Sequence, residues 1–446
     1  MNNKQQLIDF TRQEINKLDF INHHKSAPHD FTRERVFNFA LVFILLLQKS
    51  VKSLQLVLNE LFVEAHIKNT VTSSAYSQVR KKFKHTAFIA LNEKAIELYY
   101  SGNQIKRWKG YRVFGVDASR IILPNHAEIK AKFGDISIKN QHGERGHYSS
   151  AMFECRYDVL NHIAYQSELY PSDSYEVDLA LEFLKQSVAK GDDSNDLDIY
   201  DRGYASYKMV AHLMHYKRDF VIRCKANTFK EAASLFAGEG DWSKAVKLNV
   251  PQGKQNEIQA AGLPTEVEVR FVSVVLDTGE IEVLITSLMG IDLEREDFKT
   301  LYFLRWGVES FYHLLKGRLN LENFTGKSLE SVMQDFWSSI YISNVETIFT
   351  EDIEEEINAA LKPEQLSKKI NKAVSFNAIK NLAFQLFFYE EDKTIIEEKL
   401  TQLFKTNTLV QREGRSSPRN KFSWPKAINF QKRNRINAHA AFYYRK

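Results

Sequence analysis

Four residues near position 305 have the types and the spacing of a site for metal and phosphate chemistry. They are Tyr302, Arg305, Glu309 and Lys316, within residues 300–323. The apolar pattern predicts one helix here, because at about 100° per residue the four fall within an arc of roughly 60°. A phenol, a guanidinium, a carboxylate and an ammonium together can hold a metal ion and a phosphodiester side by side. The spacing also suits an ordinary amphipathic surface helix in which Arg305 and Glu309 form an ion pair.

The other side of this predicted helix is apolar, which indicates that it packs against a core. Its residues are Phe303, Leu304, Val308, Phe311, Leu314 and Leu315.

Two aspartates upstream each follow a short apolar run. Asp117 ends the run 111–116 and precedes a second predicted strand over 120–123, while Asp201 ends the run 197–200. Each run is typical of a strand. In a region where strands and helices alternate, neighbouring strands end at one edge of the sheet, and the two carboxylates are then expected to meet. Many acids in such positions only start turns, so that alternative stays open.

The order Tyr, two residues, Arg, three residues, Glu, six residues, Lys matches the YREK signature of bacterial insertion-sequence transposases with DDE catalytic domains. The sequence DRGY at 201–204 resembles the second-aspartate motif of this cut-and-paste family. The pair Phe133-Gly134 and the sequence YDVL at 157–160 also lie where the family has similar residues. The resemblance covers roughly residues 105–350.

The resemblance implies a catalytic and metal-binding triad of Asp117, Asp201 and Glu309, with two Mg²⁺ or Mn²⁺ ions per active site and Asp117 bridging both. The implied phosphate-binding residues are Tyr302, Arg305 and Lys316. The implied partner is double-stranded DNA, both the terminal inverted repeats and the target, bound by a homodimer in the synaptic complex.

The expected fold is an α/β ribonuclease-H-like catalytic core with a β-strand insertion, flanked by an all-α N-terminal domain and a helical C-terminal domain. We predict a helical DNA-end-binding domain over 1–104 and the catalytic core over 105–225 and 291–365. The β insertion then occupies 226–290, and the helical C-terminal domain with its basic tail occupies 366–446.

The N-terminal helices have two interpretations. A third helix, starting near Ser73 or Ser74, carries Lys81, Lys84 and His85 on one side, as in a helix-turn-helix-like DNA reader. A helical bundle with a lysine-rich exposed face fits the pattern equally well.

Composition excludes several other classes. A net charge of +5 and a pI of about 8.8 favour a nucleic-acid partner only weakly, although residues 411–446 carry ten Lys or Arg residues against the single acid Glu413. Two cysteines, no secretory signal and a longest apolar run of only 39–47 favour a cytoplasmic protein without a membrane span. The resemblance implies that the protein is bacterial and is associated with the nucleoid when it is bound to DNA. No Walker or Rossmann motif supports ATP or NAD binding.

The same three carboxylates would also suit a metal-dependent DNA nuclease that does not join strands. A catalytically silent DNA-binding protein is the remaining alternative.

Overall fold

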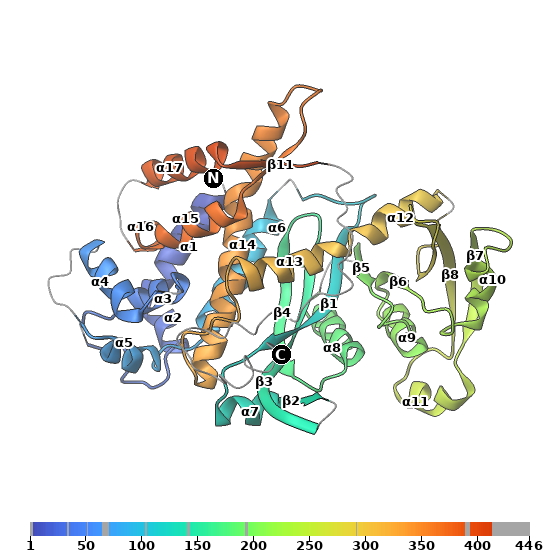
Figure 1. The fold of residues 1–446 in the computed structure, drawn as a ribbon, viewed down its shortest axis with the longest axis horizontal. Coiled ribbons are helices and arrows are strands. Elements are labelled where there is room, and N and C mark those ends of the chain that lie inside the picture. Colours follow the sequence, from blue (N-terminus) through green and yellow to red (C-terminus); the bar gives the residue numbers. More distant parts are fainter. Residues whose placement is uncertain are drawn as a thin grey trace. The chain divides into compact units, whose positions relative to one another are not determined.

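The computed structural model divides into two compact units (Figure 1). Unit 1 comprises Met1–Asn103, Ile122–Ser150 and Leu314–Lys446, and unit 2 comprises Gln104–Ile121 and Ala151–His313. The structure describes residues 3–33, 35–50, 52–64, 71–102, 105–140, 143–191, 195–290, 292–388 and 393–412. The predicted basic tail therefore lies outside the described residues from position 413 onward.

Unit 2 is built on a mixed sheet with the strand order β4-β3-β1-β5-β6-β9-β8-β7. Strands β1, β5 and β6 are parallel, and β9 is antiparallel to β6. The strands are β1 Arg112–Ile122, β3 Gly143–Asp158, β4 Ile163–Pro171, β5 Asp196–Tyr200, β6 Asp219–Arg223, β7 Ser243–Asn249, β8 Glu266–Val275 and β9 Ile281–Thr286. The strands of the predicted β insertion thus continue the central sheet.

In the first half of unit 2, helices alternate with strands along the chain, as the sequence predicts. The helices of unit 2 are α8 Glu176–Ala189, α9 Tyr207–His215, α10 Ala233–Phe236, α11 Gln255–Ala260, α12 Arg295–Phe303 and most of α13 Trp306–Gly317. Apolar side chains of α8, α9 and the strands form one buried cluster that includes Val116 and Tyr200, the last paired residues of β1 and β5.

A buried aspartate fixes the alignment of the central strands. Asp196, at the start of β5, accepts hydrogen bonds from Arg112 of β1 at 2.6 Å, from Arg156 of β3 at 2.7 Å and from Arg218 before β6 at 2.7 Å. Arg156 also donates to Asp198 at 2.9 Å. All of these side chains are almost completely buried. A one-residue slip of any strand would leave buried charges unpaired, which is strongly unfavourable.

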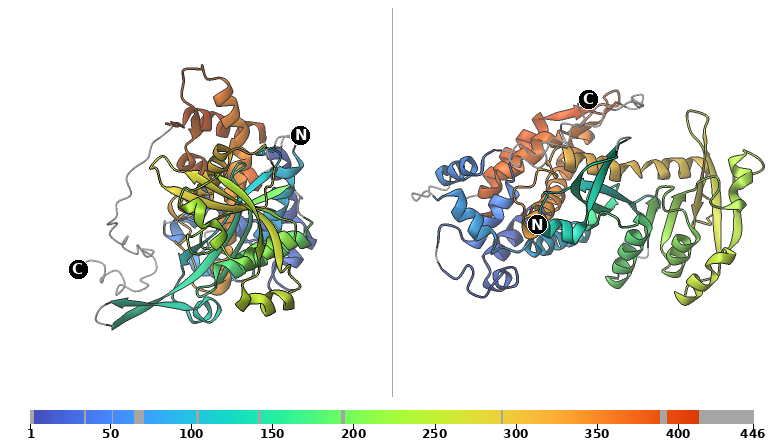
Figure 2. Two further views of the ribbon diagram at one scale, coloured as in Figure 1. Left: turned by 90° about the vertical axis from the view of Figure 1, so that its right-hand side faces the viewer. Right: turned by 60° about the horizontal axis from the view of Figure 1, so that its bottom comes forward.

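Unit 1 is helical and is organised around the long helix α14 Leu329–Ala359, which is buried on nearly every side from Val332 to Thr350. Figures 1 and 2 show helices from both ends of the sequence around it. The other helices are α1 Asn3–Asn16, α2 Leu18–His23, α3 Phe39–Leu47, α4 Leu54–Glu64, α5 Ser73–Arg80, α6 Thr86–Ser101, α7 Ala127–Phe133, α15 Lys372–Asn381, α16 Ala383–Phe387 and α17 Lys393–Thr406. Strands β2 Asp135–Asn140, β10 Lys368–Ile370 and β11 Thr408–Val410 complete the unit.

Buried polar contacts hold the N-terminal helices to α14. Arg80 of α5 donates to Gln334 at 2.7 Å and to Asp335 at 2.8 Å, and Asp335 is fully buried. The α3 helix is buried at all nine of its residues, which confirms the sequence interpretation of this apolar run as a core helix. The domain boundaries predicted at residues 104, 225, 290 and 365 remain predictions.

Two local predictions were wrong. The strands expected over 111–116 and 120–123 are one continuous strand, β1, because main-chain pairing continues past Asp117. The single helix expected over 300–323 is two helices, α12 and α13, since the amides of Leu304 and Arg305 bond to carbonyls three residues back. The break changes the direction of the side chains, and Phe303 is 70% exposed instead of packed in the core.

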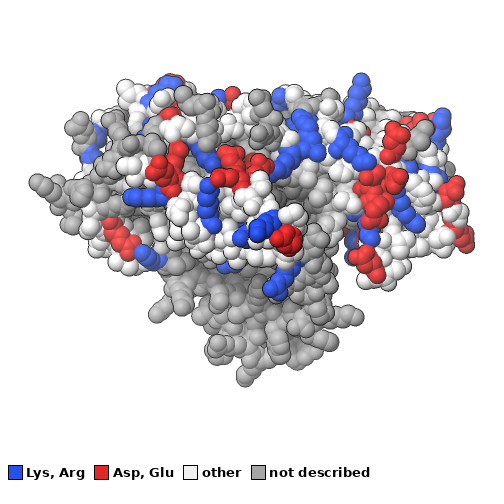
Figure 3. Space-filling model, turned by 90° about the horizontal axis from the view of Figure 1, so that it is seen from above, with Lys and Arg blue, Asp and Glu red and all other residues white. Residues whose placement is uncertain are grey.

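Among the described residues, no helix has the length and apolar character needed to cross a bilayer. On the face shown in Figure 3, described basic and acidic side chains are interspersed. On this face, the described cations therefore form local groups and not one uniformly basic surface.

The Asp196 cluster gives a stability prediction. Asp196→Ala should lower the free energy of unfolding by about 3–5 kcal/mol, because it leaves buried guanidinium groups without their carboxylate. Urea denaturation of both proteins measures the difference.

The matched control is Asp178→Ala, which removes an exposed carboxylate paired with Lys208 at 2.8 Å. That change should cost about 1 kcal/mol or less. Equal losses in the two variants would show that the Asp196 cluster does not stabilise the fold.

Candidate active site

Two predicted site residues lie side by side because of strand register. Val116 of β1 pairs with Tyr200 of β5, so Asp117 and Asp201 are the next residues on adjacent parallel strands. Neighbouring strands are about 4.8 Å apart, and residues in one row point to the same face of the sheet. The two carboxylates therefore meet where the pairing of β1 with β5 ends.

The third carboxylate comes from helix α13, which packs very closely on the sheet. A Cβ atom added to Gly115 of β1 would lie 3.2 Å from the Val308 side chain, and one added to Gly307 would lie 3.0 Å from Val159. The Tyr312 hydroxyl donates to the carbonyl of Asp117, and it lies 3.2 Å from the Phe153 carbonyl. These contacts place Glu309 close enough to Asp117 for its charge to act on that carboxyl group.

Two arginines accompany the carboxylates. Arg305 is 4% exposed and contacts Glu309 at 2.8 Å, so the ion pair expected from the i,i+4 spacing is formed. Its guanidinium also lies 4.9 Å from the centre of the Trp306 ring. Arg223 contacts Asp201 at 3.1 Å. The Tyr302 hydroxyl lies 3.5 Å from Asp201, at the limit of a hydrogen bond.

Burial perturbs the acid–base chemistry of Asp117. It raises the pKa of this carboxyl to about 7, and the nearby carboxylates Glu309 and Glu176 act in the same direction, while Arg305 opposes them. Burial also raises the pKa of the Tyr302 phenol, which keeps its proton at neutral pH. A carboxyl that titrates near neutrality in a cluster of acids is typical of a functional site.

Sequence reasoning missed three residues of this region. Arg223 belongs to the same row as the aspartates, since Tyr200 pairs with Ile222 of β6. Glu176 opens α8, and the sequence gives it only the ordinary role of an acid at a helix start.

The third missed residue, Glu154 in the middle of β3, is completely buried, and neither of its oxygens has a hydrogen-bond partner within the described part of the chain. Burial raises its pKa well above the usual range, and the charges of Asp117 and Glu176 add to the effect. An acid directly after the apolar residues Ala151, Met152 and Phe153 was the only available signal.

The structure brings five of the six predicted site residues together in unit 2. They are Asp117, Asp201, Tyr302, Arg305 and Glu309. Lys316 lies in the last turn of α13, seven residues after Glu309 and on the same side of the helix, in the part assigned to unit 1.

The carboxylates have the donor chemistry of a divalent-ion site: hard oxygens, crowded at the end of paired strands. Among the described residues, no group of three or more acids, histidines or cysteines has side chains close enough together to hold a metal ion. Glu309 contacts Arg305 and Asp201 contacts Arg223 in this arrangement. The residues fit a divalent metal ion by chemical type.

The perturbed Asp117 gives a prediction for the metal-free protein. With an unfolded pKa of about 3.9 and a folded pKa of about 7, the native state binds more protons than the unfolded state between these values. The free energy of unfolding should therefore fall as the pH rises from 4 to 7. Asp117→Asn should remove this part of the dependence and be more stable than wild type at pH 8, by about 2–4 kcal/mol.

Thermal melts with chelator at pH 5 and pH 8 measure both effects. Asp173→Asn, at an exposed position of the same unit, is the control and should melt like wild type. If Asp117→Asn were less stable than wild type at pH 8, burial beside other acids would not be destabilising the ionised Asp117 carboxylate.

Comparison with known proteins identifies the family of the chain. Residues 108–345, more than half of the chain and including all six predicted site residues, match the family model described as "Transposase DDE domain". A piggyBac transposase synaptic complex with hairpin DNA, solved by cryo-EM, is 10% identical with a TM-score of 0.48, covering 89% of this chain and 85% of that one. The comparison with curated proteins gave no match. The mixed sheet with its helices suits the fold expected of this family, and the chain therefore belongs to the transposases with a DDE domain.

Proposed function

We propose that this transposase binds the inverted-repeat ends of its own mobile element and catalyses DNA strand cleavage and strand transfer at Asp117, Asp201 and Glu309. The observation that carries the proposal is the strand register. It aligns two carboxylates on adjacent strands, and the packing of α13 on Gly115 adds the third.

Transposases with DDE domains generally use divalent metal ions, and the acids described above fit such ions by chemical type. We propose that the three carboxylates hold two Mg²⁺ or Mn²⁺ ions. Bound there, such ions supply activation of a water or a DNA 3′-hydroxyl and stabilisation of the leaving oxygen.

The other side chains would bind and orient the DNA. The Nε groups of Arg223 and Arg305 are buried and have no acceptor among the described residues. A phosphate oxygen would satisfy them, and charge-assisted bonds of this kind are strong. We assign the Tyr302 hydroxyl and Lys316 to the same phosphate-binding role. Because Arg305 also neutralises Glu309, a phosphate that engages Arg305 would free this carboxylate for a metal ion.

DNA-end recognition is assigned to the helices of residues 1–104, with phosphate contacts from the basic tail. The active assembly would be a homodimer on two DNA ends, acting in the cytoplasm and at the nucleoid of a bacterial cell. The DNA that flanks the gene supplies the inverted-repeat probe, and the full chain should bind it in preference to a scrambled duplex.

Glu309→Gln tests the catalytic assignment. The amide keeps the shape and a hydrogen bond to Arg305 but is a poor ligand for a divalent ion, so Mg²⁺-dependent nicking of inverted-repeat DNA should fall more than about 100-fold. The control is Glu296→Gln, at an exposed position on α12, which should nick like wild type. Wild-type nicking by Glu309→Gln would remove this residue from the active site.

Strand joining separates a transposase reaction from simple hydrolysis. The same preparations should transfer a labelled 3′ end into a target plasmid in the presence of Mg²⁺. Nicking without any joined product, at several DNA and metal concentrations, would favour the metal-dependent nuclease.

A further inference from the structure

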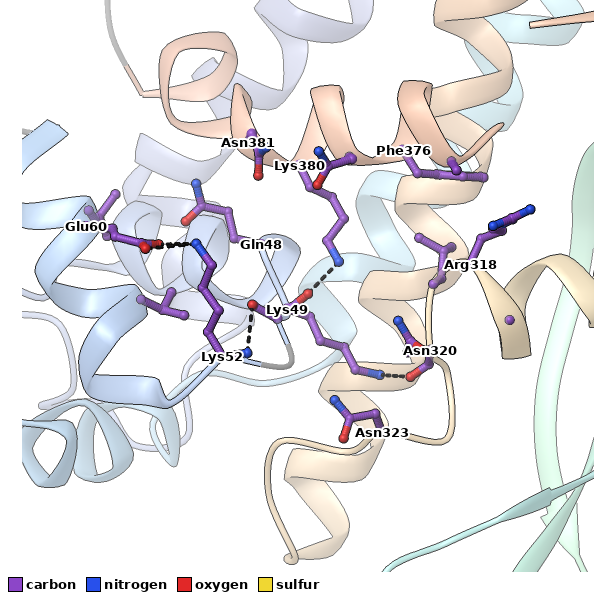
Figure 4. A pocket seen from close by; sticks show the side chains of 17 residues that line it. Gln48, Lys49, Lys52, Glu60, Arg318, Asn320, Asn323, Phe376, Lys380 and Asn381 are labelled. Atoms are coloured by element: carbon purple, nitrogen blue, oxygen red, sulfur yellow. Dashed lines mark hydrogen bonds and ion pairs between the residues drawn. The ribbon is translucent and has the colours of Figure 1, made fainter. Parts of the chain in front are cut away.

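Unit 1 contains a large polar pocket that includes none of the three triad residues. Its volume is about 830 Å³, within the range of sites for small organic ligands. Three segments form its walls: residues 48–61 around the start of α4, residues 317–323 after α13, and helix α15 (Figure 4). Every lining residue belongs to unit 1.

The pocket carries an excess of positive charge. Its cations are Lys49, Lys52, Arg318 and Lys380, against the single acid Glu60. Lys52 contacts Glu60 at 2.8 Å, so this acid is already neutralised. No carboxylate of the described chain lies within ion-pair distance of the other three cations.

Among the described residues, Lys49 and Lys380 donate hydrogen bonds only to backbone carbonyls, and Lys49 also lies 5.3 Å from the centre of the Phe324 ring. Lys49 donates to the carbonyls of Asn320 and Leu321 at 3.2 and 3.1 Å, and Lys380 donates to the carbonyl of Lys49 (Figure 4). Burial lowers the pKa of each ammonium to about 8. The charge of Lys49 also lowers the pKa of Lys380. The charge of Asp335 acts in the opposite direction on both lysines, but no carboxylate lies within ion-pair distance of either among the described residues. An anion placed between the two ammonium groups would therefore be stabilised.

Neutral hydrogen-bonding groups surround these cations. The carboxamides that line the pocket are Gln48, Asn320, Asn323, Asn377 and Asn381. Phe376 of α15 adds an aromatic wall. Arg318 is exposed at the rim, where its fork of donors suits a phosphate. The volume and the many amides indicate a ligand larger than an inorganic ion.

We propose that this pocket binds a nucleotide unit, with its phosphate between Lys49, Lys380 and Arg318 and its remaining polar groups on the carboxamides. The unit has two sources, a nucleotide within a DNA strand or a free nucleotide. The phosphate assignment stands independently of the catalytic proposal, whereas the DNA source rests on it.

The test uses the full chain and three variants. Arg318→Gln removes an exposed rim cation, and Lys380→Met removes a buried one while keeping its length. Lys362→Gln removes an exposed lysine whose side chain has no ion pair in the described chain and lies outside the pocket. Calorimetry with thymidine 5′-monophosphate, at constant ionic strength, gives the affinity of each protein.

Wild type and Lys362→Gln should bind the mononucleotide equally, and Arg318→Gln and Lys380→Met should bind it about tenfold more weakly or not at all. The salt dependence of binding to an inverted-repeat duplex identifies the source. Arg318→Gln should reduce the slope of log affinity against log salt by about one if a DNA phosphate enters the pocket. An unchanged slope, together with weakened mononucleotide binding, assigns the pocket to a free nucleotide.

Equal mononucleotide affinities in all four proteins, or no binding to wild type together with an unchanged salt slope, would overturn the proposal. Failure of the catalytic assignment gives a different result. In that case the variants of the acidic triad would still nick DNA, and mononucleotide binding to the pocket would be unchanged.

Discussion

The alignment of three parallel strands is the constraint on which the site depends. Asp196 holds β1, β3 and the segment before β6 through buried guanidinium groups at one end of the short strand β5. Five residues further along, just past the other end of the same strand, the register brings Asp117, Asp201 and Arg223 into one row. Because a slip would separate both sets at once, the pairing that stabilises the core also positions the acids.

Helix α13 reaches this row because two glycines allow it to. Gly115 and Gly307 leave room for Val308 and Val159 at distances that a side chain would not permit without movement. The tight junction has an electrostatic consequence. It buries Asp117 beside other acids and raises its pKa, and the flanking arginines occupy the two more exposed carboxylates. The site therefore combines carboxylates and guanidinium groups within one cluster, which is the mixture of charges that the function proposed above requires.

Unit 1 presents the opposite electrostatic problem. Around α14, Arg80 and Asp335 form an ion pair, whereas Lys49 and Lys380 donate hydrogen bonds to backbone carbonyls and have no carboxylate within ion-pair distance among the described residues. Unit 2 thus gathers acids beside two arginines, and unit 1 gathers cations in a pocket that has one acid among its lining residues.

The sequence by itself determined the candidate acids, the helix that carries Glu309 and most strands and helices, because periodicity and motif spacing are local properties of the chain. It also predicted the ion pair of Arg305 with Glu309, which needs only a turn of helix. Tertiary structure alone decided that β1 continues past Asp117, that the helix breaks near Leu304, and that Glu154, Glu176 and Arg223 surround the aspartates. The path of β1 and the residues around the aspartates depend on contacts between residues far apart in the sequence, whereas the helix break uses local hydrogen bonds that the periodicity of the side chains does not reveal. The pocket of Lys49, Arg318 and Lys380 arises in the same way, from three segments that no local pattern connects.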